Sequence, residues 1–260
     1  MRSDPYLAEG GRTGVLLLHG FTGSPASIRP WAEFLAEAGY SISLPRLPGH
    51  GTDWREMNET TWQDWYGAAE AALLALSTNV DRLFIAGFSM GGALSVRLTE
   101  RHPDLVTGLI LLNPALLDPH GFMRRVSALR FFKATLRPTS SDIAKPNPPI
   151  HGYRETPLTA LHSLSQLIRD IRPRLSQIEK PILLFRSIQD HVVSAASSEF
   201  ILHEAKSVDK KVVLLENSYH VATLDYDAEI INQESLAFIK RFEQITKVDA
   251  SPSDANVPHE

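Results

Sequence analysis

The chain has 260 residues, of which 43% are hydrophobic and 22% are charged, so it has the material for an ordinary globular protein with a large core. Its formal net charge of −4 argues against a nucleic-acid partner, because no global positive field is present to gather polyanions. The absence of cysteine excludes disulfides and thiolate zinc sites.

The N-terminal segment 1–10 contains Asp4 and Glu9 and lacks the apolar run that a secretory signal requires. No stretch of the chain approaches the roughly twenty uninterrupted apolar residues of a membrane span. We therefore expect a cytoplasmic protein, although a mature form that has lost its signal would give the same pattern.

Short apolar runs recur along the chain and predict buried strands over 15–18, 42–44, 83–86, 109–112, 182–185 and 212–215. Between most of them lie stretches with apolar residues at helical spacing, such as 31–38, 62–76 and 93–100. Strands that are buried on both faces and alternate with helices imply a mainly parallel, doubly wound sheet of the α/β class.

An insertion interrupts this alternation, because about seventy residues separate the fourth and fifth runs, more than one crossover helix needs. We predict that residues 116–177 form a small cap over a site at the sheet edge, while 1–115 and 178–247 form the core. The tail 248–260 is rich in Asp, Ser and Pro and is expected to be disordered.

The predicted cap contains an apolar and basic stretch, a proline-rich region over 138–149 and a helix over 158–171. The apolar side chains of its first part are Phe122, Met123, Leu129, Phe131, Phe132 and Leu136. They alternate with Arg124, Arg125, Arg130, Lys133 and Arg137. The favoured interpretation is an apolar underside that lines a pocket and a basic face in water; peripheral contact with anionic lipid is the alternative.

A serine between two glycines carries the chemical signal. Residues 84–92 read Phe-Ile-Ala-Gly-Phe-Ser-Met-Gly-Gly and place Gly-x-Ser-x-Gly between a predicted strand and a predicted helix. So sharp a turn is sterically possible only if Gly87 and Gly91 lack side chains. The unpaired N–H groups of the following helix point at Ser89, and we expect Met90 to donate one oxyanion hydrogen bond. The alternative is an ordinary strand-to-helix loop.

Two further motifs join the serine turn, and with them the chain resembles the α/β-hydrolase family. Residues 16–24 read Leu-Leu-Leu-His-Gly-Phe-Thr-Gly-Ser and look like the family's His-Gly oxyanion loop. Residues 47–53 read Leu-Pro-Gly-His-Gly-Thr-Asp and resemble its next loop. The similarity is greatest to bacterial monoacylglycerol lipases and small carboxylesterases. It implies that the backbone N–H of Phe21 is the second oxyanion donor and that His19 braces the loop.

The family's chain order of serine, acid and histidine selects the remaining catalytic candidates. His220 follows the last predicted strand and is the expected base; a surface-loop histidine is the alternative. Asp190 follows the preceding strand and resembles the family's Asp-x-x-Val acid loop. Asp118 is the rival acid, because some relatives carry the acid one strand earlier.

Three residues near these candidates are expected to have no part in catalysis. We expect Asp225 and Asp227 to cap a final helix that begins near Ala228, and His191 to point away from the site.

These residues predict a serine hydrolase that cleaves carboxylic esters through an acyl-enzyme intermediate and requires neither a metal nor an organic cofactor. The His-Gly-Phe loop, which differs from the His-Gly-Gly-Gly pattern of enzymes for tertiary-alcohol esters, favours primary-alcohol esters by resemblance. Monoacylglycerols or short-to-medium acyl esters are the expected substrates. A thioesterase, an amidase, a carbon–carbon hydrolase or a non-enzymatic ligand receptor on the same scaffold remain alternatives.

Overall fold

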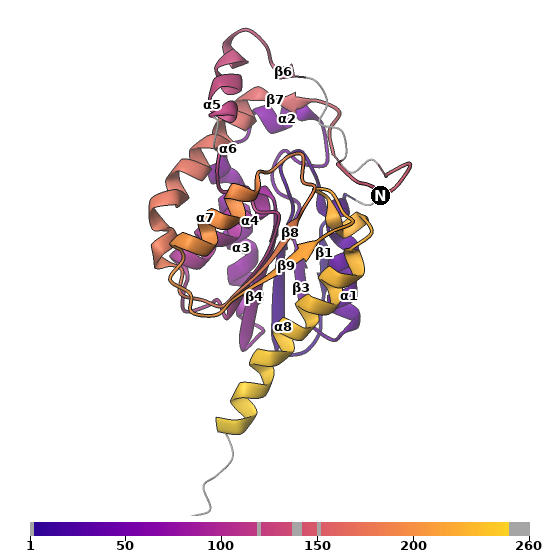
Figure 1. Ribbon diagram of the computed structural model, residues 1–260, viewed down its shortest axis with the longest axis vertical. Helices are drawn as coiled ribbons and strands as arrows, with labels where there is room; N and C mark the ends of the chain where they lie inside the picture. Colours follow the sequence, from indigo (N-terminus) through magenta and orange to yellow (C-terminus); the bar gives the residue numbers. More distant parts are fainter. Residues whose placement is uncertain (1–2, 119–120, 137–141, 150–151, 250–260) are drawn as a thin grey trace, which may run out of the picture.

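The computed structural model describes residues 3–118, 121–136, 142–149 and 152–249. Its centre is a seven-stranded sheet between two layers of helices (Figure 1). The strand order is β1-β3-β2-β4-β5-β8-β9, and every pairing is parallel except that of β1 with β3. The prediction of a mainly parallel, doubly wound sheet is confirmed.

Each predicted apolar run lies in a strand of this sheet. The strands are β2 (Thr13–Leu18), β3 (Ser41–Leu44), β4 (Arg82–Phe88), β5 (Gly108–Leu112), β8 (Ile182–Ser187) and β9 (Lys210–Leu215). The sequence did not reveal β1 (Tyr6–Ala8), a strand of three residues at the sheet edge. It is too short to give a periodic pattern, and its central side chain, Leu7, is exposed.

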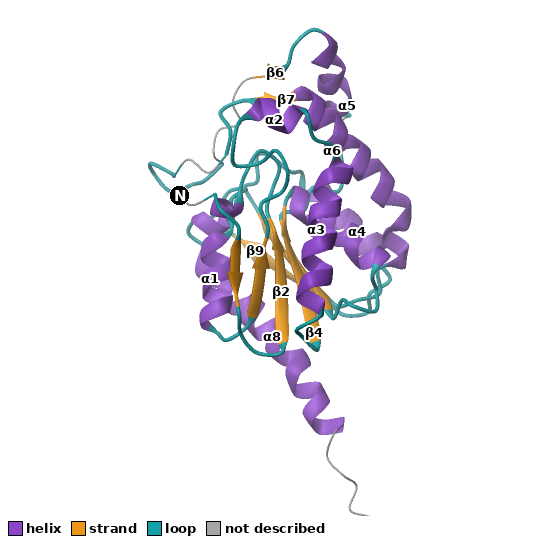
Figure 2. Ribbon diagram, turned by 180° about the vertical axis from the view of Figure 1, so that it is seen from behind, coloured by secondary structure: helices purple, strands orange, loops and turns teal. Residues whose placement is uncertain are grey.

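Alternating side chains of the strands feed two separate hydrophobic clusters, one on each face of the sheet. In β2, Leu16 and Leu18 belong to one cluster, whereas Val15 and Leu17 belong to the other. The first face is covered by α3 (Trp62–Ser77), α4 (Met90–Arg101) and α7 (Ala195–Glu204), and the second by α1 (Arg29–Glu37) and α8 (Ala228–Asp249). Figure 2 shows α3 and α4 on one side of the sheet and α1 on the other.

The insertion between β5 and β8 has two halves with different surroundings. The first half lies above the carboxyl ends of the strands, close to α2 (Trp54–Asn58) (Figure 1). It contains α5 (Phe122–Ser127), the 3-10 helix η2 (Ala128–Phe131) and the antiparallel pair of β6 (Thr135–Leu136) and β7 (Thr156–Pro157). The second half contains α6 (Leu158–Ile171) and the 3-10 helix η3 (Arg172–Gln177).

Helix α6 packs on the body of the molecule as well as on the cap. It contacts α3 and α4, and its buried side chains belong to the same hydrophobic cluster as those of the two body helices. At its C-terminal end, Asp170 pairs with Arg97 of α4 at 3.3 Å. The second half of the insertion is therefore part of the packed core.

The last helix begins at Ala228, close to the predicted start, and continues to Asp249. It therefore includes the first two residues of the tail that we expected to be disordered, and 250–260 lie outside the described residues. Among the residues that the structure describes, no helix is both long and apolar enough to cross a membrane.

Candidate active site

Ser89 lies at a sharp turn between β4 and α4. Its φ of 55° and ψ of −116° are unusual for a residue with a side chain and place its backbone under strain. Hydrogen bonds hold this conformation, because the Ser89 N–H donates to the Leu112 carbonyl at 3.0 Å and the Ser89 carbonyl accepts from Ala115 at 3.1 Å. The turn presents the serine at the N-terminus of α4, as the sequence predicted.

Three glycines make this turn possible. A Cβ atom at Gly87 would collide with the hydroxyl of Ser95, and one at Gly91 would collide with the carbonyl oxygen of Leu18 in β2. At Gly92 it would lie 2.8 Å from Pro114. The steric reason given for Gly87 and Gly91 is therefore visible in the structure.

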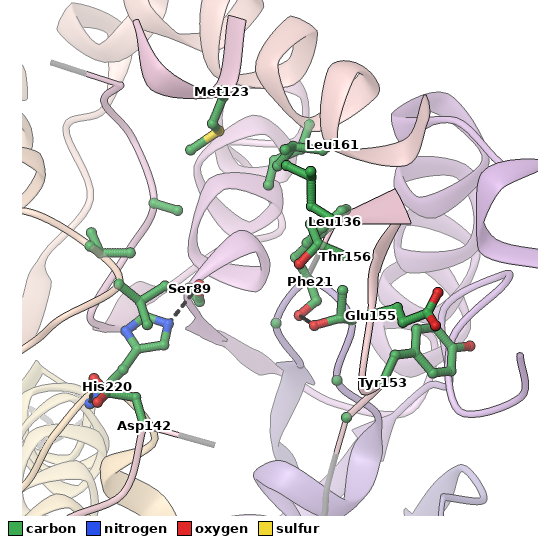
Figure 3. A pocket seen from close by; sticks show the side chains of 18 of the residues that line it. Phe21, Ser89, Met123, Leu136, Asp142, Tyr153, Glu155, Thr156, Leu161 and His220 are labelled. Atoms are coloured by element: carbon green, nitrogen blue, oxygen red, sulfur yellow. Dashed lines mark hydrogen bonds between the residues drawn. The ribbon is translucent and has the colours of Figure 1, made fainter. Parts of the chain in front are cut away.

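His220 connects Ser89 to a carboxylate. Its Nε2 lies 3.0 Å from Ser89 Oγ, and its Nδ1 lies 2.7 Å from Asp190 Oδ2 (Figure 3 shows the serine contact). Because an ionised carboxylate only accepts hydrogen bonds, Nδ1 carries the proton and the Nε2 lone pair faces the serine hydroxyl. The side chains of His220 and Asp190 are 7% and 6% exposed, so water competes little with these bonds.

Asp190 is held in place by its own loop. Its second oxygen, Oδ1, accepts the backbone N–H groups of Val192 and Val193, each at 2.8 Å. The rival acid Asp118 lies after β5, where its carbonyl accepts from Gly121 ahead of α5. The carboxylate that contacts the His220 imidazole is thus that of Asp190.

His191 points away from His220, as expected. Its Nδ1 lies 2.8 Å from Asp142 Oδ1, and its ring meets Tyr219 edge-on.

The loop after β2 lies directly against the serine. A Cβ atom at Gly20 would lie 3.3 Å from the Cβ of Ser89, and the ring of the next residue, Phe21, packs edge-on against Trp65. Met90 is the buried first residue of α4. The two residues predicted to provide oxyanion donors therefore flank Ser89.

His19 braces this loop by two hydrogen bonds. Its Nε2 accepts the N–H of Leu47 at 3.2 Å, so in the neutral ring Nδ1 donates to the carbonyl of Gly20 at 3.0 Å. Burial lowers the pKa of His19 to about 4. Burial and the neighbouring His19 lower the pKa of His50 to about 3. Both imidazoles are neutral near pH 7 and have a structural role.

A cavity of about 1060 Å³ opens beside Ser89 and His220, between the body and the cap (Figure 3). Many of the side chains that line it are apolar, and they include Phe21, Met123, Val126, Leu136, Leu161, Leu164, Val192, Val193 and Val221. Polar side chains of the cap, among them Tyr153, Glu155 and Thr156, form another part of the wall. Such a lining suits a ligand with a large apolar part and a smaller polar part.

Only some of the apolar cap residues reach this cavity. Met123 and Leu136 line it, whereas the side chains of Phe131 and Phe132 are 75% and 86% exposed. The side chain of Phe122 lies outside the described residues. The prediction of a pocket-lining underside is therefore confirmed for part of the stretch.

Asp225 and Asp227 have a different role from the one predicted. The Asp225 carboxylate accepts the N–H groups of Tyr219 and Ala144 at 3.0 and 2.6 Å, and that of Asp227 accepts the N–H of Asn217 at 2.8 Å. The backbone N–H groups of these loops are partly buried and need acceptors, and the two buried carboxylates supply them.

Asn113 and Ser187 hold the backbone of the histidine loop by hydrogen bonds to its carbonyl groups. The sequence analysis did not identify either residue. Asn113 Nδ2 donates to the His220 carbonyl at 2.9 Å, and Ser187 Oγ donates to the carbonyl of Tyr219 at 2.8 Å. The available sequence signal for Asn113 is its place directly after the apolar run 109–112. In the structure it has a positive φ of 44°, a conformation that asparagine tolerates.

A parallel sheet that places a serine elbow beside a histidine and an aspartate from later loops defines an α/β-hydrolase. Residues 11–227 match the family model described as serine aminopeptidase, S33, and the chain therefore belongs to that α/β-hydrolase family. The predicted family resemblance is confirmed.

Named relatives include lipolytic enzymes and esterases. The chain is 39% identical over 239 residues to the thermostable monoacylglycerol lipase of Bacillus sp. strain H-257, covering 92% of this chain and 95% of that enzyme. It is 28% identical to a carboxylesterase of Bacillus subtilis strain 168, covering 92% and 97%. A solved structure from work on the metagenome-derived lipolytic enzymes LipS and LipT superposes with a TM-score of 0.89 at 39% identity, covering 92% and 98%.

Proposed function

We propose that this protein is a serine hydrolase of carboxylic esters and that monoacylglycerols or similar small acyl esters are its substrates. The observation that carries the proposal is the hydrogen-bonded chain from Asp190 through His220 to Ser89 beside a largely apolar cavity. The similarity to a monoacylglycerol lipase and a carboxylesterase supports the substrate class.

Acylation begins when His220 Nε2 takes the hydroxyl proton of Ser89 and Ser89 Oγ attacks the ester carbonyl carbon. Asp190 keeps the proton on Nδ1 and stabilises the imidazolium that forms. The backbone N–H groups of Phe21 and Met90 donate to the oxyanion, and each such donor contributes on the order of 3 kcal/mol. The tetrahedral intermediate collapses when the imidazolium gives its proton to the leaving alcohol.

Deacylation repeats these steps with water. His220 removes a proton from water, the hydroxide oxygen attacks the acyl carbon, and the bond to Ser89 Oγ breaks as the imidazolium returns a proton to the serine. The products are a carboxylic acid and an alcohol, and the enzyme regains its starting state.

The cavity lining supports an ester with a fatty acyl part. Met123 and Leu136 from the cap and Leu161 of α6 line the apolar part of the wall, which offers an acyl chain a surface away from water (Figure 3). Glu155 and Thr156 offer hydrogen-bonding groups to a polar alcohol part.

The proposal is tested by comparing kcat/KM across monoacylglycerols, p-nitrophenyl esters, thioesters and amides. We expect esters to be cleaved fastest, and Ser89→Ala to abolish cleavage without changing the circular dichroism spectrum. Ser77→Ala, which removes a partly exposed serine at the end of α3, is the matched control and retains activity.

Two results would contradict the proposal. Full activity of Ser89→Ala would refute the mechanism, and faster turnover of amides or thioesters would refute the substrate class. Negligible turnover of every substrate, together with a ligand that raises the melting temperature, would favour a receptor.

A further inference from the structure

A second carboxylate, that of Asp142, lies beside His220 in addition to the Asp190 carboxylate on the ring (Figure 3 shows Asp142 and His220). Asp142 belongs to the insertion and lies within the proline-rich region 138–149, where no sequence pattern singles it out. One of its oxygens, Oδ2, accepts the backbone N–H of His220 at 3.1 Å and also the backbone N–H of His191 at 3.1 Å.

These two N–H groups belong to the two loops that carry the base and the acid. His220 is itself the proposed base, and His191 directly follows the proposed acid, Asp190. A single oxygen atom therefore fixes the backbone of both loops at one point. The Asp142 carbonyl adds a third bond by accepting the Val221 N–H at 3.0 Å.

The side chain of Asp142 is itself held in place by burial and by a further contact. Its side chain is only 12% exposed, and its other oxygen, Oδ1, contacts His191 Nδ1 at 2.8 Å. The next residue, Ile143, is 7% exposed and packs in the core cluster that lies beneath the histidine loop.

The other end of this short segment, 142–145, is fastened to the same loop. Asp225 accepts the N–H groups of Ala144 and Lys145 at 2.6 and 3.1 Å, and it also accepts the N–H of Tyr219. Segment 142–145 thus joins the insertion to the histidine loop through buried carboxylates on both sides.

We propose that Asp142 is a positioning residue for the reaction: it holds the His220 and Asp190 loops in the register that aligns the imidazole between Asp190 and Ser89. The inference rests on the proposed function. Without the shared acceptor, the two loops lose their common anchor, and a shift near 1 Å in a reacting group can cost about 100-fold in rate. Asp142 acts through the backbone and takes no proton from the substrate.

The variants separate positioning from simple weakening of the loop. Asp142→Ala removes all three side-chain contacts. Asp142→Asn keeps an oxygen that can accept both N–H groups and an amide that can donate to neutral His191. Asp227→Ala is the matched control, because it removes a buried carboxylate that anchors the same loop at Asn217 without contacting His220.

For cleavage of p-nitrophenyl butyrate, we expect Asp142→Ala to lower kcat by about 10- to 100-fold with KM changed less than about twofold. Asp142→Asn should stay within about threefold of the wild-type kcat, and Asp227→Ala within about twofold. Melting temperatures measured in parallel show how much each variant weakens the fold.

Two readouts report directly on the imidazole. The first is the rate at which phenylmethanesulfonyl fluoride modifies Ser89, which needs the same base and should fall in Asp142→Ala only. The second is the low-field proton resonance of the His220 Nδ1–H that bonds Asp190; it should broaden or disappear in Asp142→Ala and persist in Asp142→Asn and Asp227→Ala.

The inference is overturned if Asp142→Ala keeps the wild-type kcat and resonance, or if Asp227→Ala loses as much activity as Asp142→Ala. Should Asp142→Ala not fold, Asp142→Ser replaces it with the same expectations. The two proposals can fail separately. If phenylmethanesulfonyl fluoride modifies Ser89 of the wild type but the wild type cleaves no ester, the proposed function fails. The modification rates of the variants then still test the role of Asp142.

Discussion

Ser89 lies between two loops that are held in opposite ways. The oxyanion loop, residues 19–24, is braced by the buried, neutral imidazole of His19, with neutral His50 packed against it. The histidine loop, residues 216–225, is braced by carboxylates that accept its backbone N–H groups. One side of the site is supported without net charge and the other by concentrated negative charge.

The difference matches the charge that each side handles in the proposed reaction. The oxyanion loop presents N–H groups to a developing negative charge, and a nearby carboxylate would oppose it. The histidine loop carries the imidazole that becomes positively charged; the Asp190 carboxylate on the ring stabilises that state, and the other carboxylates of the loop do not oppose it. The support of each loop is therefore compatible in sign with its chemistry.

The largest loss of activity should follow removal of the Asp190 charge, because this carboxylate contacts the His220 imidazole directly. We expect Asp190→Asn to lower kcat by about 10⁴-fold, because an amide no longer holds the productive tautomer or stabilises the imidazolium. Asp118→Asn is the control and should keep kcat within about twofold of the wild type. A severe loss confined to Asp118→Asn would reverse the assignment of the acid and place the supporting charge on a different loop.

On the oxyanion side, steric fit should matter more than charge. Gly91→Ala places a methyl group against the carbonyl of Leu18, the residue before His19, and should lower the free energy of unfolding by about 3 kcal/mol. Gly67→Ala in α3 meets no atom within 4 Å and should instead raise it by about 0.5–1 kcal/mol. Urea denaturation measures the free energy of unfolding of both variants. Equal stability of the two variants would show that the backbone around Ser89 can shift to accommodate the added methyl group.

Because the imidazoles of His19 and His50 are buried and neutral, we expect the free energy of unfolding to fall in acid. Burial lowers the pKa of His19 to about 4 and of His50 to about 3, from 6.5 for the exposed group. Their contribution is complete above pH 6.5; below it the unfolded chain binds protons that the folded chain does not, so stability falls by at most about 1.4 kcal/mol per pH unit for each histidine.

His50→Phe tests this explanation. The variant keeps a ring beside Trp65 but cannot titrate. Urea midpoints measured from about pH 7.5 to about pH 5 should fall less steeply for the variant than for the wild type. Parallel curves would assign the acid sensitivity to groups other than His50.

The parts of the site that depend on chain order could be predicted from the sequence. Ser89 is marked by its glycines and its place between an apolar run and a helix pattern. His220 and Asp190 follow from their positions after late strands. Each of these signals is local, because the required backbone geometry or strand boundary lies within a few residues of the side chain.

The supporting contacts could not be predicted, because they join segments far apart in the chain. Asp142 contacts His220 across 78 residues, and Asp225 contacts Ala144 across 81. Nothing in the residues around Asp142 distinguishes it from another polar residue in a proline-rich region. For Asp225, the nearby helix start suggested a cap. In the structure its carboxylate instead accepts backbone N–H groups of two neighbouring loops, at Ala144 and Tyr219.

The packing of α6 sets a rule for building chimeras of this protein. Because its inner face fills the same cluster as α3 and α4, exchanging the whole insertion with that of a relative would replace part of the core. An exchange that ends before Leu158 keeps the buried α6 side chains of that cluster and still replaces Met123 and Leu136 on the cavity wall. Acyl-chain selectivity can thus be redesigned in the first half of the insertion while α6 remains as part of the recipient scaffold.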